Sequence, residues 1–305
     1  MDSLAAAPGT GPNTSPLPVL RKPRPRATFE GLPSDRAVVM GILNVTPDSF
    51  SDGGQNATAD TAIAAGLRMF YAGADIIDVG GESTRPGSEP VPEDEEQRRV
   101  LPVVEALAKA GALVSVDTRR ASTARAAIAA GASIVNDVSG LLATDEMARA
   151  VAEAGAYYIV MHNRGDSKAM GGLTEYTSVV QDVLAETLSV RDRFRAAGVP
   201  DERIILDPGL GFAKTAEQNW ELLAGLGAFM GHGHPVLVGA SRKRFLGELL
   251  TSGGKAAPPQ ARDAATVAVT MLSVAAGAWG VRVHDVGANL DAVKVAARAA
   301  GAAKA

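Results

Sequence analysis

The sequence contains no cysteine, no long apolar run and no excess of positive charge, and each absence excludes a class of protein. Without cysteine the chain can form neither disulfides nor Cys-ligated zinc, and it has no thiolate nucleophile. No apolar stretch approaches the roughly 20 residues needed to cross a bilayer. The formal net charge of −4 argues against general nucleic-acid binding. We therefore expect neither a nucleic-acid partner nor a membrane partner.

The first 34 residues differ from the rest of the chain in composition. This segment is rich in proline and follows neither a helical nor a strand period, so we predict a disordered tail at residues 1–34. It lacks the continuous apolar segment of a secretory signal, and we expect a cytoplasmic protein. With 46% hydrophobic residues, the 305-residue chain can bury a large core. We predict that residues 35–305 form one catalytic domain.

Short apolar runs rich in Val and Ile recur through this domain and alternate with stretches of helical spacing. The eight runs are AVVMGILNV, ADIIDVGG, ALVSVDT, ASIVNDVSG, AYYIVMH, RIILDPG, PVLVGAS and GVRVHDV. Strands that are apolar throughout and alternate with helices indicate a parallel sheet covered on both faces. Eight repeats over roughly 265 residues suit a β/α barrel, and a doubly wound open sheet is the competing arrangement. We predict an α/β fold, a single (β/α)8 TIM-type barrel with a disordered N-terminal tail.

All eight apolar runs end on polar or charged residues. In a β/α barrel the carboxyl ends of the strands form one rim, where active sites are built. An unpaired buried polar group costs about 1–3 kcal/mol, so a whole ring of them argues for a ligand that satisfies them. The residues at the run ends are Asn44; Glu82, Thr84 and Arg85; Asp117; Asn136 and Asp137; His162 and Asn163; Asp207; Ser241, Arg242 and Lys243; and Arg282, His284 and Asp285.

Three of these residues offer hydrogen-bond acceptors from different strands: Asp117, Asn136 and Asp207. Converging carboxylates repel one another unless a metal or a donor-rich ligand lies between them. A metal is the less favoured choice, because the chain has only four histidines, no HExxH motif and no ligand-spaced His pair. A planar heterocycle that presents several N–H groups fits the acidic and amide partners better.

A basic group near the end of the chain suits a phosphate. It comprises Arg242, Lys243, Arg244, Arg282 and His284, although Arg244 is expected to be a solvated turn residue. Arg282 and His284 are two apart in a predicted strand, so they project from the same face. The segment PGLGFAKT lacks the end of a P-loop, and no GxGxxG follows the first strand. From the residues alone we predict an enzyme that acts on a nitrogen-rich ring carrying phosphate.

Seven motifs together resemble those of the dihydropteroate synthases, in the same order and from about residue 38 to the end of the chain. They are GILNVTPDSFSDGG, DVGGESTRPG, SVDT, IVNDVSG, LDPGLGFAKT, VGASRKRFLG and VRVHDV. The resemblance implies a transferase of folate biosynthesis that joins 6-hydroxymethyl-7,8-dihydropterin diphosphate to p-aminobenzoate and releases pyrophosphate. It also implies a β/α barrel, a Mg²⁺ cofactor, a homodimer and a target of sulfonamides.

The resemblance also implies a role for individual residues. It places Mg²⁺ at Asn44 and the pterin ring at Asp117, Asn136, Asp207 and Lys243. It places the diphosphate near Thr84, Arg282 and His284, and frames the aminobenzoate with Arg85, Pro86, Phe212, Ser241 and Lys243.

Three residues are implied in catalysis, namely Asp117, Lys243 and, on the loop after the first strand, Asp48. Asp117 and Lys243 are expected to be needed for the chemistry, and Asp48 is expected to help position the amine. His162 and Tyr176 are expected to be structural. The segment MHNRGD stands where the family often has His-Met-Gln-Gly, so the contacts of Asn163 and Arg164 stay open.

Two alternatives accompany this hypothesis. The methyltetrahydrofolate:corrinoid methyltransferases also bind a pterin in a barrel, but they have no use for the aminobenzoate residues in STRPG and SRKRFLG. A non-catalytic paralogue would bind a ligand without turnover, and lost site residues would identify it. None of the implied positions is missing here.

Overall fold

The computed structural model describes residues 31–46, 55–83, 89–166 and 170–302. The predicted tail lies outside this part of the chain except for its last four residues. Eight parallel strands form a sheet in the order β6-β5-β4-β3-β2-β1-β8-β7. The strands are β1 (Val38–Asn44), β2 (Ile76–Gly80), β3 (Val114–Asp117), β4 (Ile134–Asp137), β5 (Tyr157–Met161), β6 (Ile204–Asp207), β7 (Leu237–Val238) and β8 (Gly280–Val283).

A single bridge between Leu206 and Val236 joins β6 to the chain just before β7. The amide of Leu206 donates to the carbonyl oxygen of Pro235 across this seam, at 2.9 Å. The two ends of the sheet therefore meet, and the sheet closes into a barrel as the alternation of apolar runs predicted. The competing open sheet is excluded.

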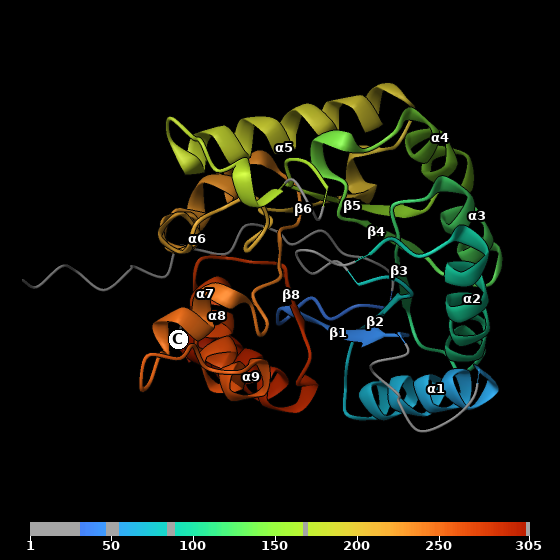
Figure 1. Ribbon diagram of the computed structural model, residues 1–305, viewed down its shortest axis with the longest axis horizontal. Coiled ribbons are helices and arrows are strands. Elements are labelled where there is room, and N and C mark those ends of the chain that lie inside the picture. Colours follow the sequence, from blue (N-terminus) through green and yellow to red (C-terminus); the bar gives the residue numbers. More distant parts are fainter. Residues whose placement is uncertain (1–30, 47–54, 84–88, 167–169, 303–305) are drawn as a thin grey trace, which may run out of the picture.

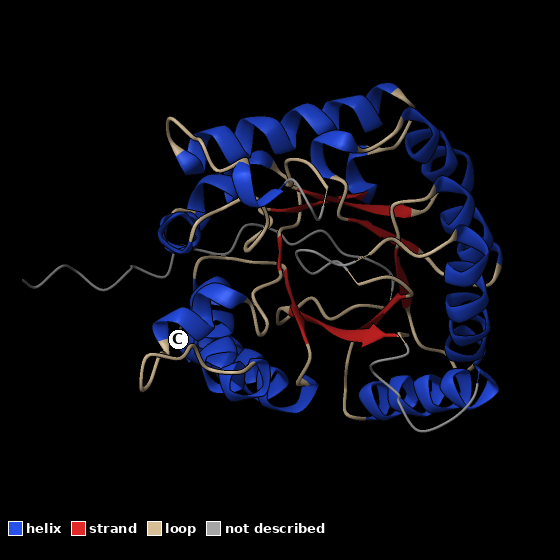
Figure 2. Ribbon diagram, viewed as in Figure 1, coloured by secondary structure: helices blue, strands red, loops and turns tan. Residues whose placement is uncertain are grey.

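Helices surround the strands, as Figures 1 and 2 show. They are α1 (Gln55–Tyr71), α2 (Glu93–Lys109), α3 (Ala121–Ala129), α4 (Asp145–Ala154), α5 (Val179–Ala196), α6 (Ala216–Ala224), α7 (Arg244–Leu249), α8 (Asp263–Ala275) and α9 (Val286–Ala302). In Figure 1 the helices follow one another around the strands in chain order, from α1 to α9. In the part of the chain that the structure describes, no helix is long and apolar enough to cross a membrane.

The strand side chains alternate between two apolar layers. One layer packs against the helices and includes Val39, Ile77 and Val135. The other fills the barrel interior with residues from around the sheet: Val38, Met40, Ile76, Ile134, Ile159, Ile205, Leu237 and Trp279. Both layers are buried, which explains why the strands read as continuous apolar runs in the sequence. The polar strand ends lie on top of the inner layer.

Local signals fix the boundaries of several helices. Thr144 precedes α4, and its hydroxyl accepts a hydrogen bond from the amide of Met147, while Gly155 ends the helix in a left-handed conformation with φ of 60°. Thr215 and Gln218 form a reciprocal capping box at the start of α6. The caps at Thr144 and Thr215 mark where these two loops of the carboxyl rim end.

Candidate active site

The arginine of β8 lies at the centre of the rim, between two carboxylates of neighbouring strands. Arg282 donates from Nε to Asp78 Oδ2 at 2.6 Å and from Nη2 to Asp117 Oδ2 at 2.8 Å. Asn136 of β4 also donates to Asp78 Oδ2, at 2.9 Å. Since β1, β2, β3, β4 and β8 are neighbours in the sheet, this network ties the predicted pterin-binding residues Asp117 and Asn136 to the predicted diphosphate residue Arg282.

Asp78 is a site residue that the sequence prediction missed. It is fully buried and lies in the middle of the run ADIIDVGG rather than at its end. Its Oδ2 accepts two hydrogen bonds, whereas its Oδ1 has no hydrogen-bond partner. A carboxylate at an inward-facing position of an otherwise apolar strand was the available signal, because a buried charge requires a partner.

Burial controls the protonation of the acidic residues on the rim. It raises the pKa of Asp117 to about 7; the charge of Arg282 opposes this shift, and the neighbouring Asp78 adds to it. Burial also raises the pKa of Asp207 on β6, against the opposing charge of Lys243. The amide of Gly209 donates to Asp207 Oδ1 at 2.7 Å, which leaves the rest of this carboxylate for other donors.

Lys243 lies across the rim from Asp117, in the loop after β7. Burial lowers its pKa to about 8, against the opposing charge of Asp207. Its ammonium lies 4.5 Å from the centre of the Phe212 ring and donates to the carbonyl oxygen of Leu210. A side chain built on Gly239 would contact Asp207, Lys243 and Arg282 at 3.7–3.9 Å. The Asp207 carboxylate and the Lys243 ammonium therefore lie at one spot, beside the Cβ atom of Arg282.

Ser241 and His284, two further predicted site residues, contact each other. The Ser241 hydroxyl lies 2.9 Å from His284 Nδ1 and accepts from the His284 amide at 3.1 Å. The hydroxyl can donate to Nδ1 or accept from it, so the contact fixes the orientation of the imidazole ring and not its tautomer. The serine predicted to frame the aminobenzoate thus orients the histidine predicted to contact the diphosphate.

The metal position predicted at Asn44 is the last residue of β1. Asn44 pairs in register with Gly80 of β2 and is half-buried at the rim. Among the described residues no group of three or more His, Asp or Glu side chains could hold a metal ion. One amide oxygen without a carboxylate cage suits Mg²⁺, which keeps several waters and takes the rest of its ligands from substrate phosphates. The residues present therefore fit a metal that binds together with the diphosphate.

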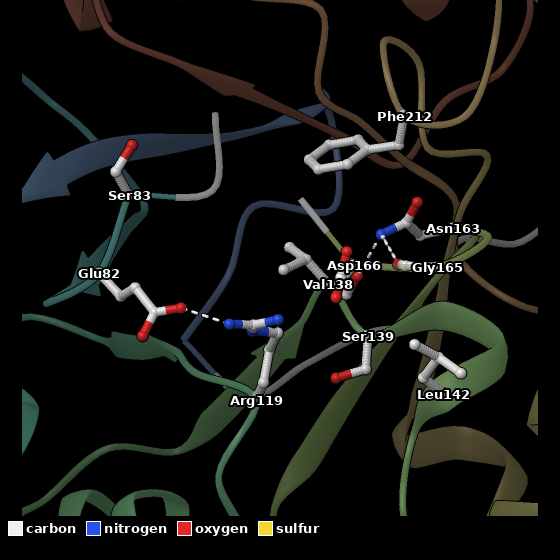
Figure 3. A pocket seen from close by; sticks show the side chains of 10 residues that line it. All are labelled: Glu82, Ser83, Arg119, Val138, Ser139, Leu142, Asn163, Gly165, Asp166 and Phe212. Atoms are coloured by element: carbon white, nitrogen blue, oxygen red, sulfur yellow. Dashed lines mark hydrogen bonds and ion pairs between the residues drawn. The ribbon is translucent and has the colours of Figure 1, made fainter. Parts of the chain in front are cut away.

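A small hollow with a volume of about 50 Å³ opens beside Phe212 (Figure 3). Its walls come from the loops after β2, β3, β4, β5 and β6. They are Glu82, Ser83, Arg119, Val138, Ser139, Leu142, Asn163, Gly165, Asp166 and Phe212. Asn163, whose contacts the sequence left open, donates from Nδ2 to the carbonyl oxygens of Val138 and Gly165 and so joins two of these loops.

Glu82, which lies just after β2, forms ion pairs with the loop after β3. It pairs with Arg119 and, at 3.0 Å, with Arg120, and accepts from the amide of Val91 at 3.1 Å. Glu82 and Val91 are therefore both linked to the loop after β3, since Arg120 also donates to the carbonyl oxygen of Val91. Thr84, Arg85 and Pro86, predicted to bind substrate from this segment, lie outside the described residues, and so does Asp48.

Known proteins resemble this chain over most of its length. Residues 40–284 match the family model described as "Pterin binding enzyme". The chain is 50% identical to the dihydropteroate synthase of Mycobacterium leprae over 84% of this chain and 91% of that protein. Among solved structures, it is similar to Xanthomonas albilineans dihydropteroate synthase with 4-aminobenzoic acid (44% identity, TM-score 0.79, 86% of this chain and 92% of that one). It is also similar to the same enzyme in complex with 7,8-dihydropteroate (41% identity, TM-score 0.77, 87% and 94%).

Proposed function

This chain belongs to the dihydropteroate synthases among the pterin-binding enzymes, and we propose that the rim around Arg282 is where its reaction takes place. It is a transferase that joins 6-hydroxymethyl-7,8-dihydropterin diphosphate to p-aminobenzoate, giving 7,8-dihydropteroate and pyrophosphate. The methyltransferase alternative is not supported, because the relatives reported above are dihydropteroate synthases over most of their length. The observation that best supports this site is that Asp117, Asp207, Lys243 and Arg282 lie close enough to interact with one another.

The pterin ring binds between the acidic and the amide side chains of the rim. Asp117 and Asp207 accept from the N–H groups of the ring, with Asn136 alongside, and Lys243 donates to a ring acceptor. Arg282 Nη2 donates to one of the two oxygens of Asp117. The ring takes over this acceptor on binding, while Arg282 stays attached to Asp78 through Nε. Its released N–H groups are then available to the diphosphate.

The bond that breaks joins the methylene carbon of the pterin to the diphosphate oxygen. Arg282 and His284 donate to the departing pyrophosphate and neutralise its growing charge. When bound at Asn44, Mg²⁺ supplies further charge neutralisation at the phosphates. The anionic Asp117 and Asp207 stabilise the positive charge that spreads into the ring.

The amine of p-aminobenzoate then forms the new bond with the same methylene carbon. An aromatic amine is neutral near pH 7, so it attacks without a strong base, and the proton that its nitrogen loses on bond formation passes to water. Phe212 packs under Lys243 and borders the hollow of Figure 3, so it fits the role of one wall for the aromatic substrate. Arg85, Pro86 and Ser241 complete the proposed aminobenzoate site, and Asp48 the positioning of the amine. Inhibition by sulfonamides is part of the same proposal.

We also propose a cytoplasmic homodimer. Exposed apolar side chains lie on α7, α8 and α9 or at their ends: Leu249 (64% exposed), Leu250 (39%), Leu272 (54%) and Val295 (60%). These helices are neighbours in Figure 1, and burial of such side chains against a second copy is favourable. Light scattering should give twice the mass of one 31.2 kDa chain.

A pyrophosphate-release assay tests the activity. The purified protein is incubated with the dihydropterin diphosphate and Mg²⁺, with and without p-aminobenzoate. We expect release that depends on both substrates. Release that is equally fast without p-aminobenzoate would identify a hydrolase, and no release in either condition would contradict the synthase assignment.

A further inference from the structure

A buried triad lies between the barrel wall and α5, and it includes one of the polar run ends, His162. His162 follows β5, and its side chain is fully buried. Its Nε2 lies 2.9 Å from Glu186 Oε2 on α5, and its Nδ1 lies 2.9 Å from Lys214 Nζ. Lys214 Nζ also donates to the carbonyl oxygens of Gly209, at 3.0 Å, and Phe212, at 2.9 Å. None of these three side chains has a part in the reaction described above.

The hydrogen-bond geometry determines where the protons lie. An ammonium has three donors and no acceptor, and two carbonyl oxygens plus His162 Nδ1 use all three. The imidazole is then neutral, with its proton on Nε2, where it donates to the carboxylate of Glu186. Burial, followed by the charge of Lys214, lowers the pKa of His162 to about 4, in agreement with the neutral form. The negative charge of Glu186 thus acts on Lys214 through the ring between them.

Other charged groups around the triad support the same assignment. Arg164 pairs with Glu186 and lies 3.9 Å from the centre of the Tyr176 ring. Burial opposes ionisation of Glu186, but hydrogen bonds from Arg164 and His162 hold its pKa at about 2. Burial acts against the ammonium form, since it lowers the pKa of Lys214 well below its usual value. Three acceptors around Nζ, namely two carbonyl oxygens and His162 Nδ1, hold the third proton on Lys214.

The two carbonyl oxygens belong to the loop that shapes the substrate site. This loop runs from Asp207 to Lys214 and contains Leu210, whose carbonyl oxygen accepts from Lys243, and Phe212, which packs against the same lysine. Its backbone is unusual: φ is +66° at Gly209, +81° at Gly211 and +48° at Ala213. A Cβ at Gly209 would overlap the carbonyl oxygen of His162. Such a conformation persists only where surrounding contacts hold it.

We propose that Lys214 is a positioning residue for the reaction, and that His162 and Glu186 hold it in place. Its ammonium ties both ends of the bend at Gly209–Phe212 to the barrel wall. This bend positions the carbonyl oxygen of Leu210 and the ring of Phe212. Both of these groups contact the Lys243 ammonium and so determine its position. His162 and Tyr176 were expected to be structural; on this account His162 acts on the substrate site through Lys214. The inference rests on the proposed function, because the affected step is binding of the pterin diphosphate.

Steady-state kinetics with matched variants test this role. Lys214→Met keeps the length of the side chain but removes all three donors. We expect the KM for the pterin diphosphate to rise about tenfold or more, since Lys243 and Phe212 lose their position. A variant that merely folds less well would lower the apparent kcat and leave KM unchanged. Thr187→Val is the control: it removes a buried hydrogen bond to Val183 on the same helix as Glu186 and should leave both constants unchanged.

A second variant and a spectroscopic readout keep the test independent of folding and of activity. Glu186→Gln retains an acceptor for His162 but removes the charge, and it should raise the same KM by a smaller factor. Nitrogen-15 NMR can resolve the four histidines of the wild-type chain. His162 should be neutral with its proton on Nε2 and should not titrate between pH 5.5 and 8.

Three results would overturn the inference. They are an unchanged KM in a folded Lys214→Met protein, the opposite tautomer of His162, or titration of His162 near its ordinary pKa. Wild-type protein without synthase activity would instead refute the proposed function, and the NMR signals would then decide the triad alone.

Discussion

The charge of Asp117 should destabilise the folded protein, and its replacement by asparagine reveals by how much. Burial raises the pKa of this carboxyl from 3.8 to about 7, so an ionised Asp117 costs the fold about 4 kcal/mol at most at pH 8. The amide of the replacing asparagine never ionises and escapes this cost. That cost already includes the attraction of Arg282, which lowers the pKa of this carboxyl. We expect Asp117→Asn to be more stable than the wild type at pH 8, by about 4 kcal/mol at most.

The change with pH of the stability difference between the two proteins tests the reasoning more strictly than its value at one pH. The folded-state pKa of an acid is raised here, so the wild type takes up a proton on folding and loses stability as the pH rises from about 4 to about 7. Between pH 5 and pH 8 the wild type should lose about 2–3 kcal/mol relative to Asp117→Asn. The advantage of the variant should therefore shrink to about 1–2 kcal/mol at pH 5 and vanish below about pH 4.

Urea denaturation of both proteins at pH 5, 6, 7 and 8 measures this change, and the synthase assay is run on the same samples. The variant should lose at least about a hundredfold in kcat/KM, because it lacks the anionic acceptor for the ring. A stability difference that stays constant with pH would refute the account of Asp117 as a carboxylate ionised against its burial. Near-normal turnover of the folded variant would refute its role in the reaction.

Four further predictions concern the same site and the tail. The plot of kcat/KM against pH should be bell-shaped, rising through about pH 7 as Asp117 loses its proton and falling above about pH 8 as Lys243 loses its own; a flat profile over this range would contradict both assignments. Calorimetry should detect no tight Mg²⁺ binding to the free protein and clear binding once diphosphate is present, because Asn44 offers only one amide ligand. Calorimetry should also find very weak binding of p-aminobenzoate to the free protein and appreciable binding with pyrophosphate, Mg²⁺ and a pterin present, whereas equal affinities would mean a preformed site. A chain that starts near Ser34 should match the full chain in Tm and rate, and a drop of several degrees would show that the removed residues pack on the barrel.

The barrel could be predicted from the sequence because its strands are buried on both faces. Each strand therefore appears as a separate apolar run, and eight such runs left little choice of fold. The single bridge at which the barrel closes, between Leu206 and Val236, was not visible in this pattern. The run PVLVGAS forms a strand of only two residues, Leu237–Val238, since Pro235 has no amide to donate and Gly239 lies beside Asp207, Lys243 and Arg282.

The site was predictable where a polar residue ends a strand and was missed where a polar residue lies within one. Asp117, Asn136 and Arg282 are joined in one network, as the ring of polar strand ends suggested. Asp78 belongs to the same network but was hidden in the apolar run ADIIDVGG. The partners of a buried charge depend on strand register, which pairs Asp78 with Ser115 and cannot be read from one strand alone.

Two further contacts required the folded chain. Ser241 bonds to His284 across 43 positions of sequence, and Lys214 reaches His162 across 52. Neither pair shares a motif, so no spacing rule could connect them. The roles of Asp48, Thr84, Arg85 and Pro86 stay predictions, because these residues lie outside the described part of the chain.

The direct test of the central claim is identification of the product by mass spectrometry. Wild-type protein is incubated with the dihydropterin diphosphate, p-aminobenzoate and Mg²⁺, and a folded Lys243→Ala variant serves as the control. The account predicts 7,8-dihydropteroate in equal amount to pyrophosphate with the wild type and at least about a hundredfold less with the variant. Absence of 7,8-dihydropteroate with the folded wild type, or equal amounts from both proteins, would contradict it.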